Sequence, residues 1–215
     1  MDIIEKFQNP TYTENFADTL QCSTNFYITA FLIVFCPLNW SFLGRMEYKY
    51  QVLSKLMFGS RKLGNMLFAF IVFTLSSIRN YFIVRTLIFL PRLVLQGGLA
   101  TYVPIIAVII FLIGCSFVFG AYYRLGISGT YYGDHFGILM ENRVVDFPFN
   151  VTDHPMYNGA LTIFLGGIIY FTSVLGLVLL ALMFTMYRVI EWIELPMTEE
   201  LYSKDTKSQK TKKTN

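Results

Sequence analysis

Few residues of this sequence carry a charge. Asp, Glu, Lys and Arg make up 14% of its 215 residues, against about 25% in an average soluble domain. A transmembrane helix needs about 20 mainly apolar residues. Four runs without any charge come close to that length or exceed it: Asn25–Gly44, Leu63–Ile78, Leu93–Tyr123 and Pro155–Tyr187. The scarcity of charge excludes an ordinary soluble domain and predicts an all-α, polytopic membrane helix bundle with four to five membrane segments.

The sequence also lacks the motifs of the common cofactor-binding and hydrolase folds. Its three cysteines, Cys22, Cys36 and Cys115, are too far apart for a C-x-x-C metal site or a disulfide framework, and we expect them to be small apolar fillers. A P-loop, a G-x-S-x-G elbow and an H-E-x-x-H helix are absent. Any cofactor is therefore expected to bind in a pocket between membrane helices. We expect neither a metal ion nor a nucleic-acid partner.

Basic residues gather in two segments and predict which side of the membrane these segments occupy. Arg45–Lys62 carries five basic residues against one acid, and the tail Glu199–Asn215 carries five lysines. The positive-inside rule places both in the cytosol. Residues 1–24 are polar and acidic, unlike the basic start of a cleaved signal peptide. We therefore expect three parts: a lumenal segment over 1–24, a membrane domain over 25–198 and a cytosolic tail over 199–215.

The last uncharged run is too long for one straight crossing. Pro155–Tyr187 would form a helix of about 50 Å, against a hydrocarbon core of about 30 Å. A hairpin that turns near Thr172–Ser173 gives five membrane segments and places Arg124–His154 on the cytosolic side with the tail. In the alternative topology, the first run is re-entrant at Pro37 and the final run is a single span. That alternative moves the long connection to the lumen.

Two further segments are predicted near the membrane surface. Arg79–Arg92 holds three arginines among apolar residues, which is typical of an interfacial segment whose arginines reach the headgroups. Pro196 is expected to end the last helix near Leu195. Lys212 and Lys213 match the dilysine retrieval signal and predict the endoplasmic reticulum membrane.

The connection Leu125–Gly159 is where we expect chemistry, because long polar loops on rigid scaffolds often carry function. It ends in a helix start, with His154 at the cap position and Pro155 as the first helical residue. His154 is a candidate proton carrier at the membrane surface. The alternative is that this histidine only caps the helix and packs.

Two carboxylates follow the last apolar run. Glu191 and Glu194 are three residues apart and share a helical face. Carboxylates at a bilayer boundary are costly unless they are paired or functional. The structural alternative is a salt bridge between Arg188 and Glu191, which explains Glu191 more readily than Glu194.

Five sequence blocks in order carry a family resemblance. They are CPLNWSFLGRMEY (Cys36–Tyr48), LGISGTYYGDHFGILMENRV (Leu125–Val144), FPFN (Phe147–Asn150), PMYNG (Pro155–Gly159) and PMTEELY (Pro196–Tyr202). With them the sequence resembles the small endoplasmic reticulum phospholipid N-methyltransferases, the phosphatidylethanolamine N-methyltransferase family. The HPMYNG block also resembles an element of the isoprenylcysteine carboxyl methyltransferases. The resemblance implies S-adenosylmethionine as the methyl donor and a membrane phospholipid as the acceptor.

The family's two cofactor motifs are present only in part. Its G-x-G falls on Leu112-Ile113-Gly114, and its Glu-Glu pair falls on Glu194-Leu195. The two leucines imply a narrower cofactor cleft and one hydrogen-bond acceptor fewer for the ammonium or ribose of S-adenosylmethionine. Gly114 has an alternative explanation, because small residues in membrane helices usually permit close packing. The resemblance implies these cofactor-binding residues: Ile113, Gly114, Pro155, Tyr157, Gly159 and Glu194.

The remaining candidates concern the lipid acceptor. His154 and Glu191 are candidate bases for its amine. Some tyrosines are expected to face the sulfonium or the methylated ammonium, or else to form an interfacial belt. These are Tyr122, Tyr123, Tyr131, Tyr132 and Tyr157. Three arginines are candidates for the lipid phosphate: Arg45, Arg124 and Arg143.

Three functions remain open at this stage. The first is successive N-methylation of phosphatidylethanolamine and its mono- and dimethyl derivatives to phosphatidylcholine, in the endoplasmic reticulum membrane or its mitochondria-associated part. The second is methylation of a prenylated cysteine carboxylate, against which the FPFN and GDHFGIL blocks speak. The third is a methyltransferase-like scaffold without cofactor, which Leu112 and Leu195 keep open.

Overall fold

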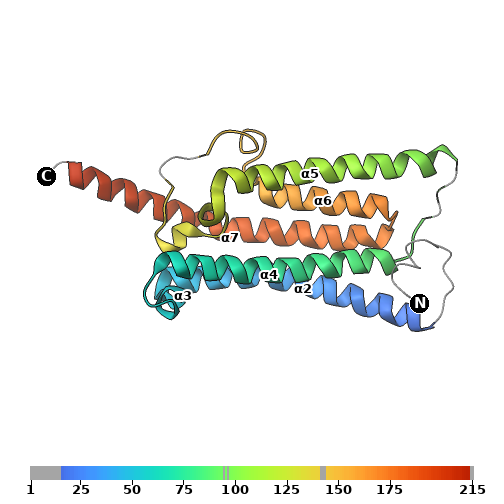
Figure 1. Cartoon of the computed structure of the whole chain (residues 1–215), viewed down its shortest axis with the longest axis horizontal. Helices are drawn as coiled ribbons and strands as arrows, with labels where there is room; N and C mark the ends of the chain where they lie inside the picture. The colour runs from blue at the N-terminus through green and yellow to red at the C-terminus, as the bar shows by residue number, and fades with distance from the viewer. Residues whose placement is uncertain (1–15, 94, 96, 141–143, 214–215) are drawn as a thin grey trace.

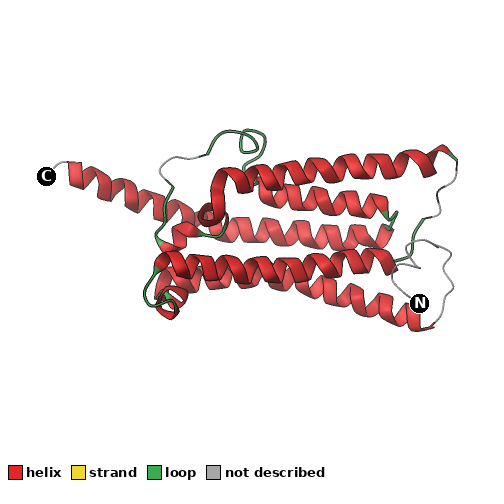
Figure 2. Ribbon diagram, in the orientation of Figure 1, coloured by secondary structure: helices red, strands yellow, loops and turns green. Residues whose placement is uncertain are grey.

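The protein is a bundle of long helices (Figures 1 and 2). The computed structural model describes residues 16–93, 95, 97–140 and 144–213, and none of these forms a β-strand. Four helices are long and apolar enough to span a membrane, within Thr24–Tyr50, Arg61–Phe89, Gly98–Phe136 and Val174–Glu194. The predicted all-α membrane bundle is confirmed. The elements are α2 (Phe16–Tyr50), α3 (Val52–Leu56), α4 (Arg61–Phe89), α5 (Gly98–Thr130), the 3-10 turn η1 (Gly133–Phe136), α6 (Pro155–Tyr170) and α7 (Val174–Lys213).

The final apolar run forms the predicted hairpin. Helix α6 ends at Tyr170 and α7 begins at Val174. Thr172 lies in the turn and is joined to the α4–α5 link, because the Leu93 N–H donates to its carbonyl oxygen at 3.0 Å and its hydroxyl donates to the Leu93 carbonyl at 2.9 Å. Helix α2 is continuous through Pro37. The alternative topology, with a re-entrant first run and a single last span, is therefore wrong.

The two ends of the bundle carry the segments that the charge pattern groups together (Figure 1). One end holds α3, η1, the long connection before α6 and the part of α7 that projects from the bundle. The other end holds the start of α2, the α4–α5 link and the hairpin turn. Residues 1–15 of the expected lumenal segment lie outside the described residues. Which end faces the cytosol stays a prediction.

Two predicted boundaries are wrong. The Arg79–Arg92 segment is not interfacial, because α4 continues to Phe89 and the Arg79 side chain is only 5% exposed. Pro196 does not end the last helix, because α7 continues to Lys213. A charge inside a span and a proline inside a helix are tolerated where neighbouring groups compensate them, and a single sequence does not reveal these neighbours.

The connection that follows α5 is shorter than the sequence suggests. Helix α5 passes through a kink at Gly126, whose φ of 63° favours glycine, and continues to Thr130. The Asn65 side-chain amide donates to the Tyr131 carbonyl oxygen at 2.6 Å and ties this end of α5 to α4. Phe136 of η1 is buried against Phe68 of α4. The start of the expected loop is thus folded back onto the bundle.

Glu47 organises the turn between α2 and α3. Its carboxylate is 1% exposed, accepts from the Leu53 N–H at 2.7 Å and from the Ser54 N–H at 3.3 Å, and also accepts from the Ser54 hydroxyl. We expect Glu47→Ala to lower stability by about 2–3 kcal/mol, because buried donors lose a charged acceptor. Thermal denaturation in lipid nanodiscs measures this loss. Glu47→Gln keeps one acceptor oxygen and should lose less, and an unchanged melting temperature in both variants contradicts this role.

Candidate active site

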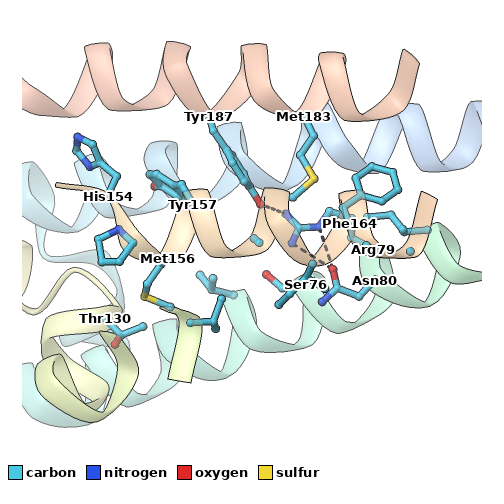
Figure 3. Close-up of a pocket in the computed structure, with 18 of the residues that line it drawn as sticks. Ser76, Arg79, Asn80, Thr130, His154, Met156, Tyr157, Phe164, Met183 and Tyr187 are labelled. Carbon is cyan, nitrogen blue, oxygen red and sulfur yellow. Dashed lines mark hydrogen bonds between the residues drawn. The ribbon is translucent and has the colours of Figure 1, made fainter. Parts of the chain in front are cut away.

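A cavity of about 750 Å³ lies between α4, α5, α6 and α7 (Figure 3). Much of its wall is apolar. Three apolar wall residues, Val84 of α4 and Val108 and Phe111 of α5, are about half exposed. This exposure on both helices indicates that the cavity opens toward the lipid-facing surface between α4 and α5, where an apolar chain can enter it from the bilayer.

The opposite end of the cavity is polar. Glu194 of α7 lies there, and its carboxylate accepts a hydrogen bond from the Tyr132 hydroxyl. Asp134 of η1 and Thr130 at the end of α5 line the same end. The buried Thr130 hydroxyl has no hydrogen-bond partner among the described residues. An unpaired buried hydroxyl is unfavourable, so this end is suited to a polar ligand.

Three aromatic side chains form a row along one wall (Figure 3). The Tyr157 ring stacks on the Tyr187 ring, with centroids 4.7 Å apart and an interplanar angle of 28°. The His154 ring follows, with its centroid 6.4 Å from that of Tyr157. All three residues line the cavity. The row leads from the middle of the bundle to its polar end.

His154 occupies the predicted cap position of α6, with Pro155 as the first helical residue, but its side chain makes no capping hydrogen bond. Its Nδ1 lies 3.9 Å from Glu191 Oε1, and Arg188 forms an ion pair with the same oxygen at 2.9 Å. Arg188 also donates to Asn158 of α6 at 3.0 Å. Glu191 does not line the cavity. Glu191 contacts His154 from outside the cavity and forms the salt bridge with Arg188 that the sequence predicts as the structural alternative.

The structure brings only part of the expected cofactor set to the cavity. Pro155, Tyr157 and Glu194 line it, as does the candidate base His154. Ile113 does not line it and is half exposed on the outer surface of α5.

Two glycines of that set lie at the α5–α6 contact. A Cβ on Gly114 would be 2.7 Å from the Gly159 carbonyl oxygen, and a Cβ on Gly159 would be 2.9 Å from the Gly114 carbonyl oxygen. Neither glycine lines the cavity. In the structure, these glycines allow α5 and α6 to pack closely. A role in binding the methyl donor stays a prediction, and the geometry does not support it.

Two of the three expected phosphate-binding arginines, Arg45 and Arg124, are also outside the cavity. Arg45 donates to the Ile193 carbonyl oxygen at 2.8 Å, and Arg124 pairs with Asp146 at 3.1 Å. Arg143 lies outside the described residues. Leu112 is 59% exposed and points away from the cavity, so it does not narrow the cleft as expected.

The tyrosines divide into two groups. Tyr122 and Tyr123 are exposed on the outside of α5, where membrane-interface residues are common. Tyr131, Tyr132 and Tyr157 line the cavity.

Sequence reasoning missed several lining residues, among them Arg79, Thr130, Asp134 and Tyr187. A signal existed for Arg79, since an isolated arginine inside a span-length apolar stretch is unusual. The other three have residue types that are ordinary in loops and helices.

The protein is a multi-pass membrane bundle, and its cavity joins a lipid-facing opening to a polar end. Such a cavity suits an amphiphilic ligand. The chain belongs to the phospholipid methyltransferase family, whose sequence model matches residues 102–205. Phosphatidylethanolamine N-methyltransferase A of Dictyostelium discoideum is 37% identical over 89% of this chain and 88% of its own length. No solved structure matches the chain. The resemblance predicted from the five blocks is confirmed.

The similar proteins carry two different enzyme names. The phosphatidyl-N-methylethanolamine N-methyltransferase of Schizosaccharomyces pombe is 37% identical over 88% of this chain and 96% of its own length. The human phosphatidylethanolamine N-methyltransferase is 34% identical over 83% of this chain and 88% of its own length.

Proposed function

We propose that this chain is a phospholipid N-methyltransferase that methylates phosphatidylethanolamine and its mono- and dimethyl derivatives to phosphatidylcholine. The relatives are named for both the first and the later acceptors. The observation that carries the proposal is the cavity, which joins an apolar opening at the bilayer to a polar end with Glu194 and His154. An amphiphilic lipid and a water-soluble donor can meet there.

S-adenosylmethionine is the proposed methyl donor, and the polar end fits its chemistry. The Glu194 carboxylate would accept from its ammonium or ribose hydroxyls, and the unpaired Thr130 hydroxyl offers a further polar contact. The faces of Tyr132 and Tyr157 suit positive charge. When bound, the donor supplies a methyl group on a positively charged sulfur.

The protein's own residues would prepare the acceptor. The lipid amine needs a free lone pair, so its proton must leave before it can attack. His154 lines the cavity and its side chain is nearly half exposed, so it can accept this proton and release it to water. Glu191 Oε1 lies 3.9 Å from Nδ1 and helps to hold the ring in place. The cavity walls keep the amine in position.

The other two functions have less support. None of the relatives that we compare is named for prenylcysteine methylation. The scaffold hypothesis depends on Leu112 and Leu195 weakening the cofactor site. Leu112 lies outside the cavity, so it does not support that hypothesis. The side chain of Leu195 is outside the described part of the chain. We propose the endoplasmic reticulum membrane as the location, from the resemblance to that family.

Methyl transfer to defined lipids tests the function. The purified chain in nanodiscs receives labelled S-adenosylmethionine and one of three acceptors, the unmethylated, monomethyl or dimethyl lipid. Labelled product on at least one acceptor is expected, and the three rates rank the acceptors. A folded chain that labels none of them contradicts the proposal and favours the scaffold.

His154→Gln is expected to lower kcat by about 100-fold near neutral pH, the usual range for loss of a general base. The loss should shrink at higher pH, because the amine then loses its proton to solvent without help. Rates from pH 6 to 10 on the dimethyl lipid measure this. The exposed Trp192 provides the control variant Trp192→Phe. A loss that is equal at every pH contradicts the role as a base.

A further inference from the structure

Arg79 is a buried cation inside a membrane span. It lies 18 residues after Arg61 and ten before Phe89 in α4, and it is 5% exposed. Its side chain lines the cavity, well inside the bundle (Figure 3). A charge at such a depth is costly and usually marks a ligand or ion site.

The partners of Arg79 are all neutral. Its Nη1 donates to the Tyr187 hydroxyl at 3.1 Å, and its Nε and Nη2 donate to Asn80 Oδ1 at 3.4 and 3.2 Å. The ring of Trp40 lies 6.0 Å from its guanidinium carbon. Within the described ranges, no carboxylate forms an ion pair with it. A guanidinium has five N–H donors, so one on Nη1 and one on Nη2 remain for another acceptor.

The surroundings of Arg79 suit a lipid. Val84 and Leu87 of the same helix line the cavity on one side of it, and the lipid-facing opening lies between Val84 and Phe111. Acyl chains that enter through this opening would bring a headgroup beside Arg79. A phosphodiester accepts two parallel hydrogen bonds from one arginine, which matches the two free donors.

The distance from phosphorus to nitrogen in the ethanolamine headgroup matches the spacing of the Tyr187 and Tyr157 rings. Phosphorus and nitrogen are separated by an O–C–C link that spans about 5 Å when extended, since each bond is about 1.5 Å long. Tyr187 contacts Arg79, and the Tyr157 ring is 4.7 Å further along. A phosphate at Arg79 therefore places the amine near Tyr157, and the His154 ring centroid lies 6.4 Å beyond that of Tyr157. Tyr187 and Glu194 are seven residues apart, about 10 Å along α7, which separates this place from the proposed donor end.

We infer that Arg79 binds the phosphate of the phospholipid acceptor and thereby sets the depth at which the amine meets the donor. The inference rests on the proposed function. It gives Arg79 the role that the sequence suggested for Arg45, Arg124 or Arg143. The other anion available in the reaction is the carboxylate of the donor, and the experiment separates the two.

The test compares two acceptors in the intact chain. One is the dimethyl phospholipid, and the other is a diacyl dimethylaminopropane lipid, which has a tertiary amine but no phosphate. For Arg79→Gln we expect kcat/KM on the phospholipid to fall about 100-fold, as for loss of one partner of a buried charge pair. Methylation of the phosphate-free lipid and the KM for S-adenosylmethionine should stay within about threefold. Arg85→Gln is the matched control, because Arg85 is on the same helix and does not line the cavity.

Each outcome decides the inference. An equal loss on both lipids overturns it, and a raised KM for S-adenosylmethionine assigns Arg79 to the donor carboxylate instead. If the parent chain methylates none of the three phospholipid acceptors, the proposed function fails and the inference fails with it. If Arg79→Gln does not fold, Arg79→Lys gives the same comparison, because it keeps the charge and loses the two-pronged geometry. That variant should lose at least about tenfold on the phospholipid alone, and equal losses on both lipids again overturn the inference.

Discussion

Replacing Glu194 by glutamine is expected to raise the KM for S-adenosylmethionine by roughly 10²–10³-fold, the range for truncating one partner of a buried charge pair. The Glu194 carboxylate of α7 lines the cavity, and the Tyr132 hydroxyl donates to it. Glutamine keeps the size and one acceptor oxygen but loses the charge that would attract the donor's ammonium. Steady-state kinetics with the dimethyl lipid in nanodiscs measure the KM for S-adenosylmethionine separately from the KM for the lipid.

The matched control is Glu191→Gln, on the same helix and three residues earlier. Glu191 lies behind His154 and outside the cavity. We expect the KM of this variant for S-adenosylmethionine to change less than about threefold, while kcat falls about tenfold because His154 loses the neighbour that holds its ring in place. If Glu194→Gln leaves the KM for the donor unchanged, Glu194 is not part of the donor site.

Gly114→Ala is expected to destabilise the bundle by about 3 kcal/mol, at the upper end of the range for overpacking. A Cβ at this position would lie 2.7 Å from the Gly159 carbonyl oxygen and 2.7 Å from the Ile163 backbone nitrogen. Both atoms belong to the backbone of α6, so the helices must separate. Thermal denaturation in nanodiscs measures the loss.

Gly98→Ala is the control within α5, because its Cβ would meet only the Tyr102 ring at 3.6 Å, an ordinary contact. The same experiment separates packing from donor binding. Packing predicts that Gly114→Ala lowers the melting temperature and leaves the KM for the donor nearly unchanged in the protein that remains folded. A raised KM with an unchanged melting temperature would instead place Gly114 in the donor site.

The bundle could be predicted because length and charge determine it locally. Pro155–Tyr187 is too long for one span, and Thr172 indeed lies in the turn between α6 and α7. Pro155 at the first helical position marked the start of α6 in the same way. These signals depend on the segment itself and on the thickness of a bilayer, so one sequence suffices.

The cavity could not be predicted with the same success because its residues meet across helices. Arg79 resembled an interfacial arginine, but its hydrogen bond to Tyr187, 108 positions later in the sequence, holds it inside the bundle. Gly114 matched a cofactor motif, whereas the backbone of Gly159 explains its size. Residue type and spacing along one helix do not reveal which face meets a neighbouring helix.

The central claim is that lipid and donor meet in the cavity between α4, α5, α6 and α7. Electron cryo-microscopy of the chain in nanodiscs, with S-adenosylhomocysteine and the dimethyl phospholipid bound, tests it most directly. We expect the nucleoside at the Glu194 end, the phosphate beside Arg79 and the lipid nitrogen between them near Tyr157. Either ligand bound outside this cavity, with the chain folded as described, would contradict the account.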